Sequence, residues 1–286
     1  RMLTSRGVHI VLKQRLCPQR IGLLLPSTDD GRVLFMLPFF GRTLVGTTDT
    51  PCNQSQAAAP SDREQSYLLD YVNRWFPGLS SMEIGSCWAG GRPLLMPADT
   101  EVNSSRVVRE HEVETLPSGL VSVMGGKWTT CRPMAIDTLK AVAKQLDQPL
   151  PPSRDLPLIG SAINPLQTPE RLIGQRSTLQ GLLPDSPWHA AQLDHLESSH
   201  GLNAAGLVNS WSTEDREPLS QVMPICKGEL RHAIEKEKAR SVTDVLARRT
   251  RLAMVDRDEA QRLTPLVSEL LDQCGHGDNT PLDLNH

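Results

Sequence analysis

Residues 118–146 read SGLVSVMGGKWTTCRPMAIDTLKAVAKQL, which is a short apolar run, a Gly-Gly-Lys turn and a helical pattern. The apolar run predicts a buried strand, and Gly125 and Gly126 lack the side chains that would keep a ligand from the backbone. The free N–H groups at the start of the following helix, with Lys127 beside them, favour a carbonyl oxygen or an anion. Taken alone, such a turn is more often an ordinary connection with a solvated lysine.

The helical pattern after the turn predicts an amphipathic helix, because its apolar residues recur at helical spacing. These residues are Ile136, Leu139, Ala143 and Leu146. Upstream of this stretch, alternating apolar residues predict strands, and Asp30-Gly31 is a hairpin signal between two of them. The predicted strands cover residues 7–13, 20–26, 32–40, 43–50, 84–90 and 106–115.

A helix interrupts these strands, because Ser61 and Glu64 form a capping box and Leu68, Val72 and Trp75 follow on one helical face. Downstream, the density of prolines between residues 147 and 168 indicates a stiff connection. Three helices are then predicted near the C-terminus, at residues 228–239, 241–254 and 256–273.

The fold class predicted from this order is α+β. We expect a mostly antiparallel, β-rich domain at residues 1–147, a Pro-rich linker at 148–167 and an all-α helical domain at 168–286.

Bulk properties exclude several classes of protein. A net charge of −3 gives no reason to expect a nucleic-acid partner. No apolar run is long enough to span a bilayer and no signal-peptide pattern is present, so we expect a cytoplasmic protein or a peripheral one. The six cysteines are scattered without metal-ligand spacing, which predicts reduced thiols and no metal site.

Two side chains have the chemistry for oxidising an alcohol. His9 lies on a predicted strand, and an imidazole can take the proton of an alcohol as hydride leaves the same carbon. Arg92 lies between Gly90-Gly91 and Pro93, so its planar guanidinium is well placed to donate two hydrogen bonds to a phosphate or alkoxide. A lone histidine on a strand is more often structural, and Gly-Arg-Pro is equally typical of a surface loop.

Five motifs together resemble FAD-dependent glycerol-3-phosphate dehydrogenases: SRGVHIVL, GRTLVGTTDT, AGGRPLL, GGKWTTCR and VLARRTRLAM, which match in order and approximate spacing. The likeness runs from about residue 5 to residue 273 and covers the C-terminal half of that family. It implies FAD-dependent oxidation of sn-glycerol 3-phosphate to dihydroxyacetone phosphate, with quinone as the electron acceptor. It also implies peripheral attachment to an inner membrane, cytoplasmic or mitochondrial, and raises a homodimer as a further partner.

The resemblance also assigns roles to individual residues. His9 and Arg92 become catalytic, while Arg92, Arg109 and Lys127 become ligands of the substrate phosphate, with Arg106 as an alternative. The flavin-facing residues that it implies are Gly125, Gly126, Lys127, Trp128 and Thr129. The chain departs from the family at Val108, Glu110 and Cys131.

No G-x-G-x-x-G follows a strand and opens a helix, so the cradle that holds the FAD pyrophosphate is expected in a missing N-terminal Rossmann half. The chain is therefore expected to be a fragment that is inactive alone. Two alternatives remain: a catalytically silent interaction module, and a related flavin-dependent amine or amino-acid oxidase, which needs only one bidentate arginine for a carboxylate.

Two further motifs have structural interpretations. Thr47, Thr48 and Asp49 are typical of a polar turn held by hydroxyl and carboxylate hydrogen bonds. ARRTR, residues 247–251, is a basic helical stretch that we expect to dock the helical part on the rest, with a solvated face or an anion site as alternatives.

Overall fold

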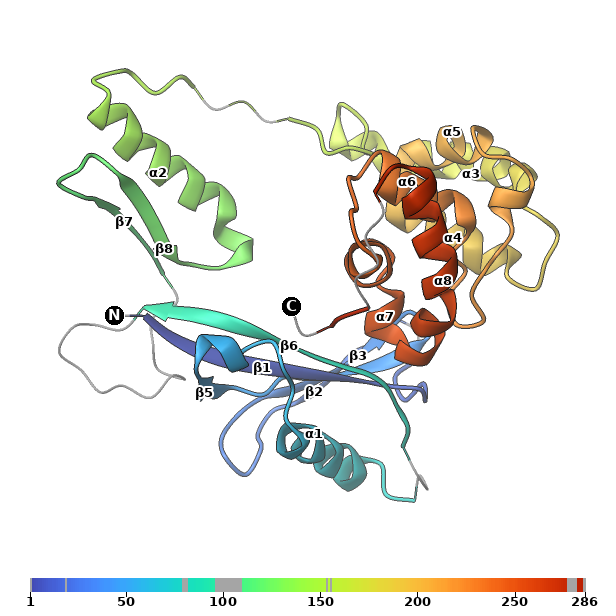
Figure 1. Ribbon diagram of the computed structural model, residues 1–286, viewed down its shortest axis with the longest axis horizontal. Helices are drawn as coiled ribbons and strands as arrows, with labels where there is room; N and C mark the ends of the chain where they lie inside the picture. The colour runs from blue at the N-terminus through green and yellow to red at the C-terminus, as the bar shows by residue number, and fades with distance from the viewer. Residues whose placement is uncertain are drawn as a thin grey trace.

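The computed structural model describes residues 2–18, 20–78, 82–95, 110–152, 154, 156–276 and 282–284. The chain is α+β, as predicted. Its sheets are antiparallel, and more of its described residues lie in helices than in strands. A long curved sheet carries one helix below it, a small two-stranded sheet with its own helix lies above one end, and a group of helices lies above the other (Figure 1).

The large sheet has six strands that are all antiparallel to their neighbours. They run in the order β2-β3-β4-β1-β5, and β6 pairs with β1. The strands are β1 (Met2–Leu12), β2 (Leu23–Leu25), β3 (Leu34–Phe39), β4 (Arg42–Gly46), β5 (Thr50–Cys52) and β6 (Ile84–Leu95). The predicted hairpin is confirmed, since β2 and β3 pair across a turn in which Gly31 has a φ of 77°.

One face of this sheet packs on α1 (Asp62–Trp75), which follows the short helix η1 (Gln54–Gln56). The predicted capping box at Ser61 is confirmed, because Glu64 N donates to Ser61 Oγ at 3.4 Å and the Glu64 side chain accepts from Ser61 N at 3.3 Å. Leu68 and Val72 are buried against the sheet as predicted. Trp75 was expected on the same face and is 55% exposed, because it is the last residue of the helix.

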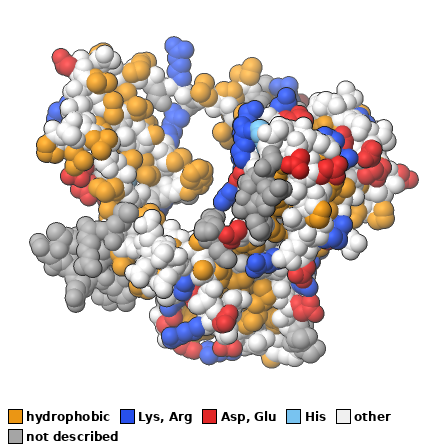
Figure 2. Space-filling view, viewed as in Figure 1, with side chains coloured by type: hydrophobic (Ala, Val, Ile, Leu, Met, Phe, Trp, Pro, Cys, Tyr) orange, Lys and Arg blue, Asp and Glu red, His pale blue; other side chains and the backbone are white. Residues whose placement is uncertain are grey.

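The organising stretch forms a small unit of its own. β7 (His111–Thr115) pairs with β8 (Val121–Gly125), and a short helix, η3 (Trp128–Thr130), leads into α2 (Cys131–Gln145). The strand, turn and helix are therefore confirmed, but the burial predicted for them is wrong. Val123 is 41% exposed, and Leu139 and Leu146 are 51% and 61% exposed. Hydrophobic side chains accordingly gather on the surface of this unit (Figure 2).

The remaining helices form the helical region, residues 165–276. They are η4 (Pro165–Gln167), α3 (Thr168–Leu182), α4 (His189–His200), η5 (Gly201–Asn203), α5 (Ala204–Asn209), η6 (Glu214–Arg216), α6 (Lys227–Glu235), η7 (Asp244–Arg249), α7 (Leu252–Val255) and α8 (Arg257–Gln273). The single helix predicted at 241–254 is wrong, because a π-helix and a short α-helix meet there at Arg251, whose φ is 61°.

α7 joins the helical region to the sheet. Ser86 Oγ donates to Ala253 O at 2.7 Å, and Trp88 Nε1 donates to Met254 O at 3.3 Å. Next to them, Arg42 Nη2 lies 2.6 Å from Asp256 Oδ2. These contacts fix the end of the helical region against β4 and β6. Within the described residues, no helix is both long and apolar enough to cross a bilayer.

Candidate functional site

The face of the large sheet opposite α1 carries both predicted catalytic side chains. On β1 and β6 the pairs Gly7–Gly90 and His9–Trp88 are in register, and Arg92 lies in the next pair on the same face. Gly7 lies under the Arg92 guanidinium, whereas Gly90 leaves its strand uncovered next to the aromatic pair. A Cβ on Gly90 would meet no atom within 4 Å, so the sheet is open at this point.

The His9 ring is held in one orientation. It stacks on Trp88 with ring centroids 4.6 Å apart and planes 19° apart. The other side of the ring lies over Gly46 in β4, where a Cβ would come within 2.3 Å of His9 Cδ2. Glycine at position 46 is therefore required for this orientation.

His9 is a neutral imidazole in this setting. Burial, and secondly the nearby Arg92 charge, lower its pKa to about 4. Its Nδ1 is buried and makes no hydrogen bond within the described part of the chain. A neutral ring with an unsatisfied nitrogen is equipped to accept a proton or a hydrogen bond from a ligand on this face.

Arg92 lies across Gly7, where a Cβ would come within 2.4 Å of its Nη2. The guanidinium donates to Thr47 Oγ1 at 3.1 Å and to Thr48 O at 3.2 Å, and it lies 3.6 Å from an Asp49 carboxylate oxygen. The polar turn at 47–49 therefore holds the arginine in place while the side chain stays 30% exposed toward the open face.

The hydroxyl bonds predicted for this turn are present. Thr48 Oγ1 accepts from Val8 N at 3.0 Å and donates to Glu64 Oε1 at 3.1 Å. The turn is thus tied to β1 and to α1 at once. The sequence interpretation gave these residues a scaffold role only and did not find their contact with Arg92.

The flavin-facing residues implied by the resemblance lie at the end of β8. Gly125 and Gly126 have φ of 72° and 81°, which side chains rarely adopt, and a Cβ on Gly126 would meet Met134 Sδ at 2.5 Å. Trp128 is 90% exposed, and Thr129 is exposed beside it. Lys127 is the N-cap residue of η3. The predicted turn at the glycines is therefore real, but Met134 and Leu95 pack against it, and its exposed side chains are those of Lys127, Trp128 and Thr129.

The two groups of residues meet at the end of β6. A Cβ on Gly125 would lie 2.8 Å from Leu95 Cδ1, and Leu95 is three residues beyond Arg92 on the same strand, or about 10 Å along it. The structure thus places His9 and Arg92 together and the Gly125 turn one strand end away. Arg109, with its alternative Arg106, lies outside the described residues.

The residues present fit the ring and substrate side of a flavin rather than its pyrophosphate. The uncovered strand at Gly90 and the exposed Trp128 offer an open, partly apolar surface, and the buried His9 Nδ1 has no hydrogen-bond partner among the described residues. Sequence reasoning missed Gly7, Gly46 and Trp88. A signal existed for the first two, because isolated glycines inside a strand pattern often mark a close approach of another group.

For the basic stretch at 247–251, which we expected to dock the helical part on the rest, the ion pairs found lie within the helical region, and docking stays a prediction. Arg248 pairs with Asp244 at 2.6 Å, and Arg249 lies 3.6 Å from Glu237, both within the helical region. The contacts with the sheet come from Ala253, Met254 and Asp256, directly downstream.

Comparison with known proteins agrees with this arrangement. Residues 1–134 match the family model described as FAD dependent oxidoreductase, and residues 152–278 match the C-terminal domain of alpha-glycerophosphate oxidase. The chain is 34% identical over 281 residues to a probable mitochondrial glycerol-3-phosphate dehydrogenase of Dictyostelium discoideum. It is 32% identical over 280 residues to the mitochondrial glycerol-3-phosphate dehydrogenase of Homo sapiens.

These alignments cover 93% of the chain but only 42% and 37% of the two relatives, so the chain spans about two fifths of their length. A solved structure of glycerol-3-phosphate dehydrogenase from Bacillus halodurans, complexed with FAD, superposes on 97% of the chain and 54% of its own with a TM-score of 0.76 and 26% identity. The motifs, both family models and this fold agree, and the chain belongs to the family of FAD-dependent glycerol-3-phosphate dehydrogenases.

Proposed function

We propose that this chain supplies the substrate side of an enzyme that oxidises sn-glycerol 3-phosphate to dihydroxyacetone phosphate. The observation that carries the proposal is the pairing of a neutral, oriented His9 with a fixed Arg92 beside the uncovered strand at Gly90. This arrangement suits a secondary alcohol whose oxygen needs both a hydrogen-bond donor and a proton acceptor.

In the proposed reaction, C2 of the substrate becomes a carbonyl carbon. Bound FAD would supply the two-electron acceptor for the hydride of C2. His9 accepts the hydroxyl proton, and Arg92 donates to the reacting oxygen, which carries developing negative charge. Lys127, together with Arg109, binds the phosphate. A bound dianion offsets the repulsion between Arg92 and a protonated His9, so substrate binding makes His9 a stronger base.

Gly125, Gly126, Lys127, Trp128 and Thr129 are the residues that we propose to face the flavin ring. The glycines let a ring approach the backbone, and the N–H groups at the start of η3 and α2 favour negative charge on its near edge. Their support is the left-handed turn at Gly125 and Gly126 and the exposed Trp128 side chain.

We infer a substrate-binding domain at 1–147, a linker at 148–167 and a helical domain at 168–286, supported by separate hydrophobic cores in the sheet and the helices. We further propose quinone as electron acceptor, peripheral attachment to an inner membrane and a homodimer. Their support is the family resemblance, together with the mitochondrial names of the relatives.

The substrate role of Arg92 is tested by Arg92→Ala and Arg92→Lys in a full-length context. Losing a charge-assisted hydrogen bond at the reacting oxygen is expected to lower kcat/KM about tenfold to a hundredfold. Lysine keeps the charge without the planar fork, so the activity of Arg92→Lys should fall between that of the wild type and that of Arg92→Ala. Wild-type turnover in Arg92→Ala would contradict the proposal.

A pair of glycine variants separates geometry from folding. Gly7→Ala places a methyl group into the Arg92 guanidinium and is expected to lower kcat/KM about as much as Arg92→Lys. Gly90→Ala, in the paired position on the same face, has free space and serves as the matched control. Equal losses in both variants would show that the guanidinium position is unimportant.

The silent-module alternative rests on the lack of a dinucleotide cradle in this sequence. Flavin retention discriminates a silent module from an enzyme. The purified chain is mixed with FAD and passed through gel filtration, and its visible absorption is recorded before and after glycerol 3-phosphate is added. Retained flavin that bleaches would mean that the chain holds a working site by itself. Loss of the flavin would mean that the activity needs further chain.

A further inference from the structure

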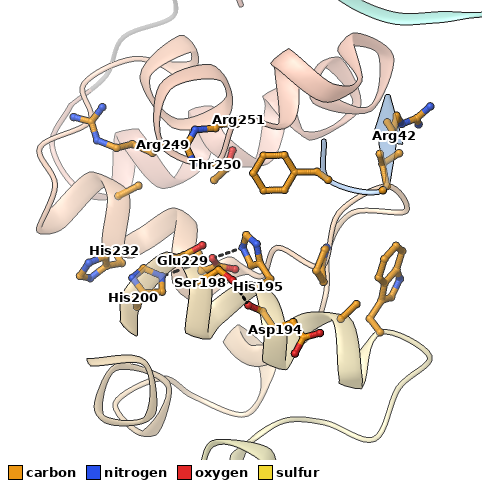
Figure 3. Close-up of a pocket in the computed structure, with 18 of the residues that line it drawn as sticks. Arg42, Asp194, His195, Ser198, His200, Glu229, His232, Arg249, Thr250 and Arg251 are labelled. Atoms are coloured by element: carbon orange, nitrogen blue, oxygen red, sulfur yellow. Dashed lines mark hydrogen bonds and ion pairs between the residues drawn. The ribbon is translucent and has the colours of Figure 1, made fainter. Parts of the chain in front are cut away.

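A cavity of about 930 Å³ lies between the helical region and the large sheet, and none of the residues of the proposed active site lines it. Its walls come from α4, α6, η7 and the turn between β3 and β4 (Figure 3). Its volume falls within the range of pockets that hold small organic molecules.

Charged side chains line this cavity, and most of them already have partners of opposite charge. The paired cations are Lys13 with Glu83, Arg42 with Asp256, Arg248 with Asp244 and Arg249 with Glu237. Among the acids, Glu229 Oε1 is 2.8 Å from His195 Nε2, and Asp194 is 2.5 Å from Arg176. Arg251 is the remaining cation of the lining, and its charge is available to an anion.

Arg251 is the most unusual of these cations. It follows the π-helix η7 and adopts a left-handed backbone with a φ of 61°, and both features are typical of functional sites. No carboxylate in the described ranges pairs with it. It lies close enough to His195 to oppose the protonation of that ring, so the two side chains share one space.

Two histidines line the same cavity as Arg251. His195 binds Glu229, which raises the His195 pKa despite burial. His200 Nε2 is buried 3.7 Å from Glu229 Oε1, beyond hydrogen-bond distance, and has no hydrogen-bond partner among the described residues. It therefore has a donor or acceptor left for a ligand.

The rest of the wall is apolar. Phe40, Trp188, Val222 and Pro224 line the same cavity, and a phosphate ion alone would leave most of the volume empty. Aromatic and aliphatic walls with a few convergent polar groups are typical of sites for an organic ligand.

We propose that this cavity binds a small organic phosphate, with the phosphate on Arg251 and His200 and the apolar body against Phe40 and Trp188. Phe40 belongs to the turn of the large sheet, whereas Arg251 and His200 belong to the helical region. A ligand in this position bridges the two parts at their junction. The site is separate from the one proposed for glycerol 3-phosphate.

The proposal is tested by titrating the full 286-residue chain with phenyl phosphate in a calorimeter. Arg251→Asn removes the charge and keeps a residue that tolerates a left-handed backbone, so affinity is expected to fall about tenfold or more. Lys238→Asn is the matched control, because Lys238 also has a φ of 61° and does not line the cavity. Its affinity should match the wild type.

Further binding measurements test where the phosphate binds. Phenol, which lacks the phosphate dianion, should bind at least about tenfold more weakly than phenyl phosphate. Arg92→Ala should leave binding unchanged. Binding lost in Arg92→Ala but kept in Arg251→Asn would assign the anion to the proposed substrate site and overturn the proposal, as would an equal loss in Lys238→Asn.

The phosphate could come from a free metabolite or from a lipid head group, and we favour the free molecule. Vesicles of equimolar phosphatidylcholine and phosphatidic acid should therefore not displace phenyl phosphate. Displacement by these vesicles, or no heat of binding with phenyl phosphate at all, would contradict the proposal.

Discussion

At the scale of single residues, the proposed chemistry depends on the charge state of His9. Burial is the larger cause of its low pKa and Arg92 the smaller one. A histidine with a free-chain pKa near 6.5 is thus held neutral down to about pH 4. Because the unfolded chain binds this proton more readily, His9 lowers the stability of the fold progressively as the pH falls from 6.5 toward 4.

These two causes can be separated by NMR titration of the imidazole nitrogens. In the wild-type chain, we expect the His9 signals to move only near pH 4. In Arg92→Ala they should move at higher pH but still below 6.5, because the burial remains. His9→Gln identifies the signals. A wild-type titration near pH 6.5 would mean that the ring is solvated and would remove the argument for a neutral base.

At the scale of elements, one largely buried ion pair contributes to the junction between α7 and the sheet. Arg42 and Asp256 are 13% and 7% exposed, and Asp256 also accepts a hydrogen bond from Glu259 N at the start of α8. Arg42→Leu leaves that carboxylate unpaired and should lower the free energy of unfolding by about 3 kcal/mol in urea titrations.

The control for this measurement is Lys140→Ala, which removes an exposed pair with Asp137 on α2. Its effect should stay below about 0.5 kcal/mol. If Arg42→Leu were as mild as Lys140→Ala, the ion pair would not hold the junction together.

The elements also show how far sequence reasoning reaches. Local signals predicted the hairpin at Asp30-Gly31 and the capping box at Ser61, because both depend on a few adjacent residues. No glycine or proline in the sequence around Arg251 indicates that the helix breaks there. The break arises where Thr250 N and Oγ1 both donate to Val245 O, five residues back, at 3.0 Å and 2.9 Å.

For the site, the sequence predicted the types of the functional residues but not how they pair in space. The types of His9 and Arg92 indicated their chemistry, but the pairing that puts Gly7 beneath the guanidinium and Trp88 beneath the imidazole is set by strand register. Register joins residues about 80 positions apart, and neither composition nor periodicity encodes it. The exposure of Leu139 was likewise undetermined, because a helical stripe does not say whether anything covers it.

At the scale of the whole molecule, stability is unevenly distributed. The sheet with α1 and the helices α6 to α8 each have a core of fully buried side chains. The unit of β7, β8 and α2 has no buried residue in any of its three elements. A two-stranded sheet with one half-exposed helix is marginal by itself, although this unit carries the turn that we propose to face the flavin.

Native-state hydrogen exchange should therefore rank these parts. Amides of β8 and α2 are expected to exchange through local opening at a low free energy, whereas those of β1 and α8 should exchange only near global unfolding. If the Gly125 turn faces the flavin, added FAD should slow exchange from Gly125 to Thr129 and leave α8 unchanged, because ligand binding stabilises only the state that it contacts. Equal protection in β8 and β1 without FAD would contradict the ranking. Slowing in α8 alone would place the flavin elsewhere, and the low stability of this unit would then have no link to cofactor binding.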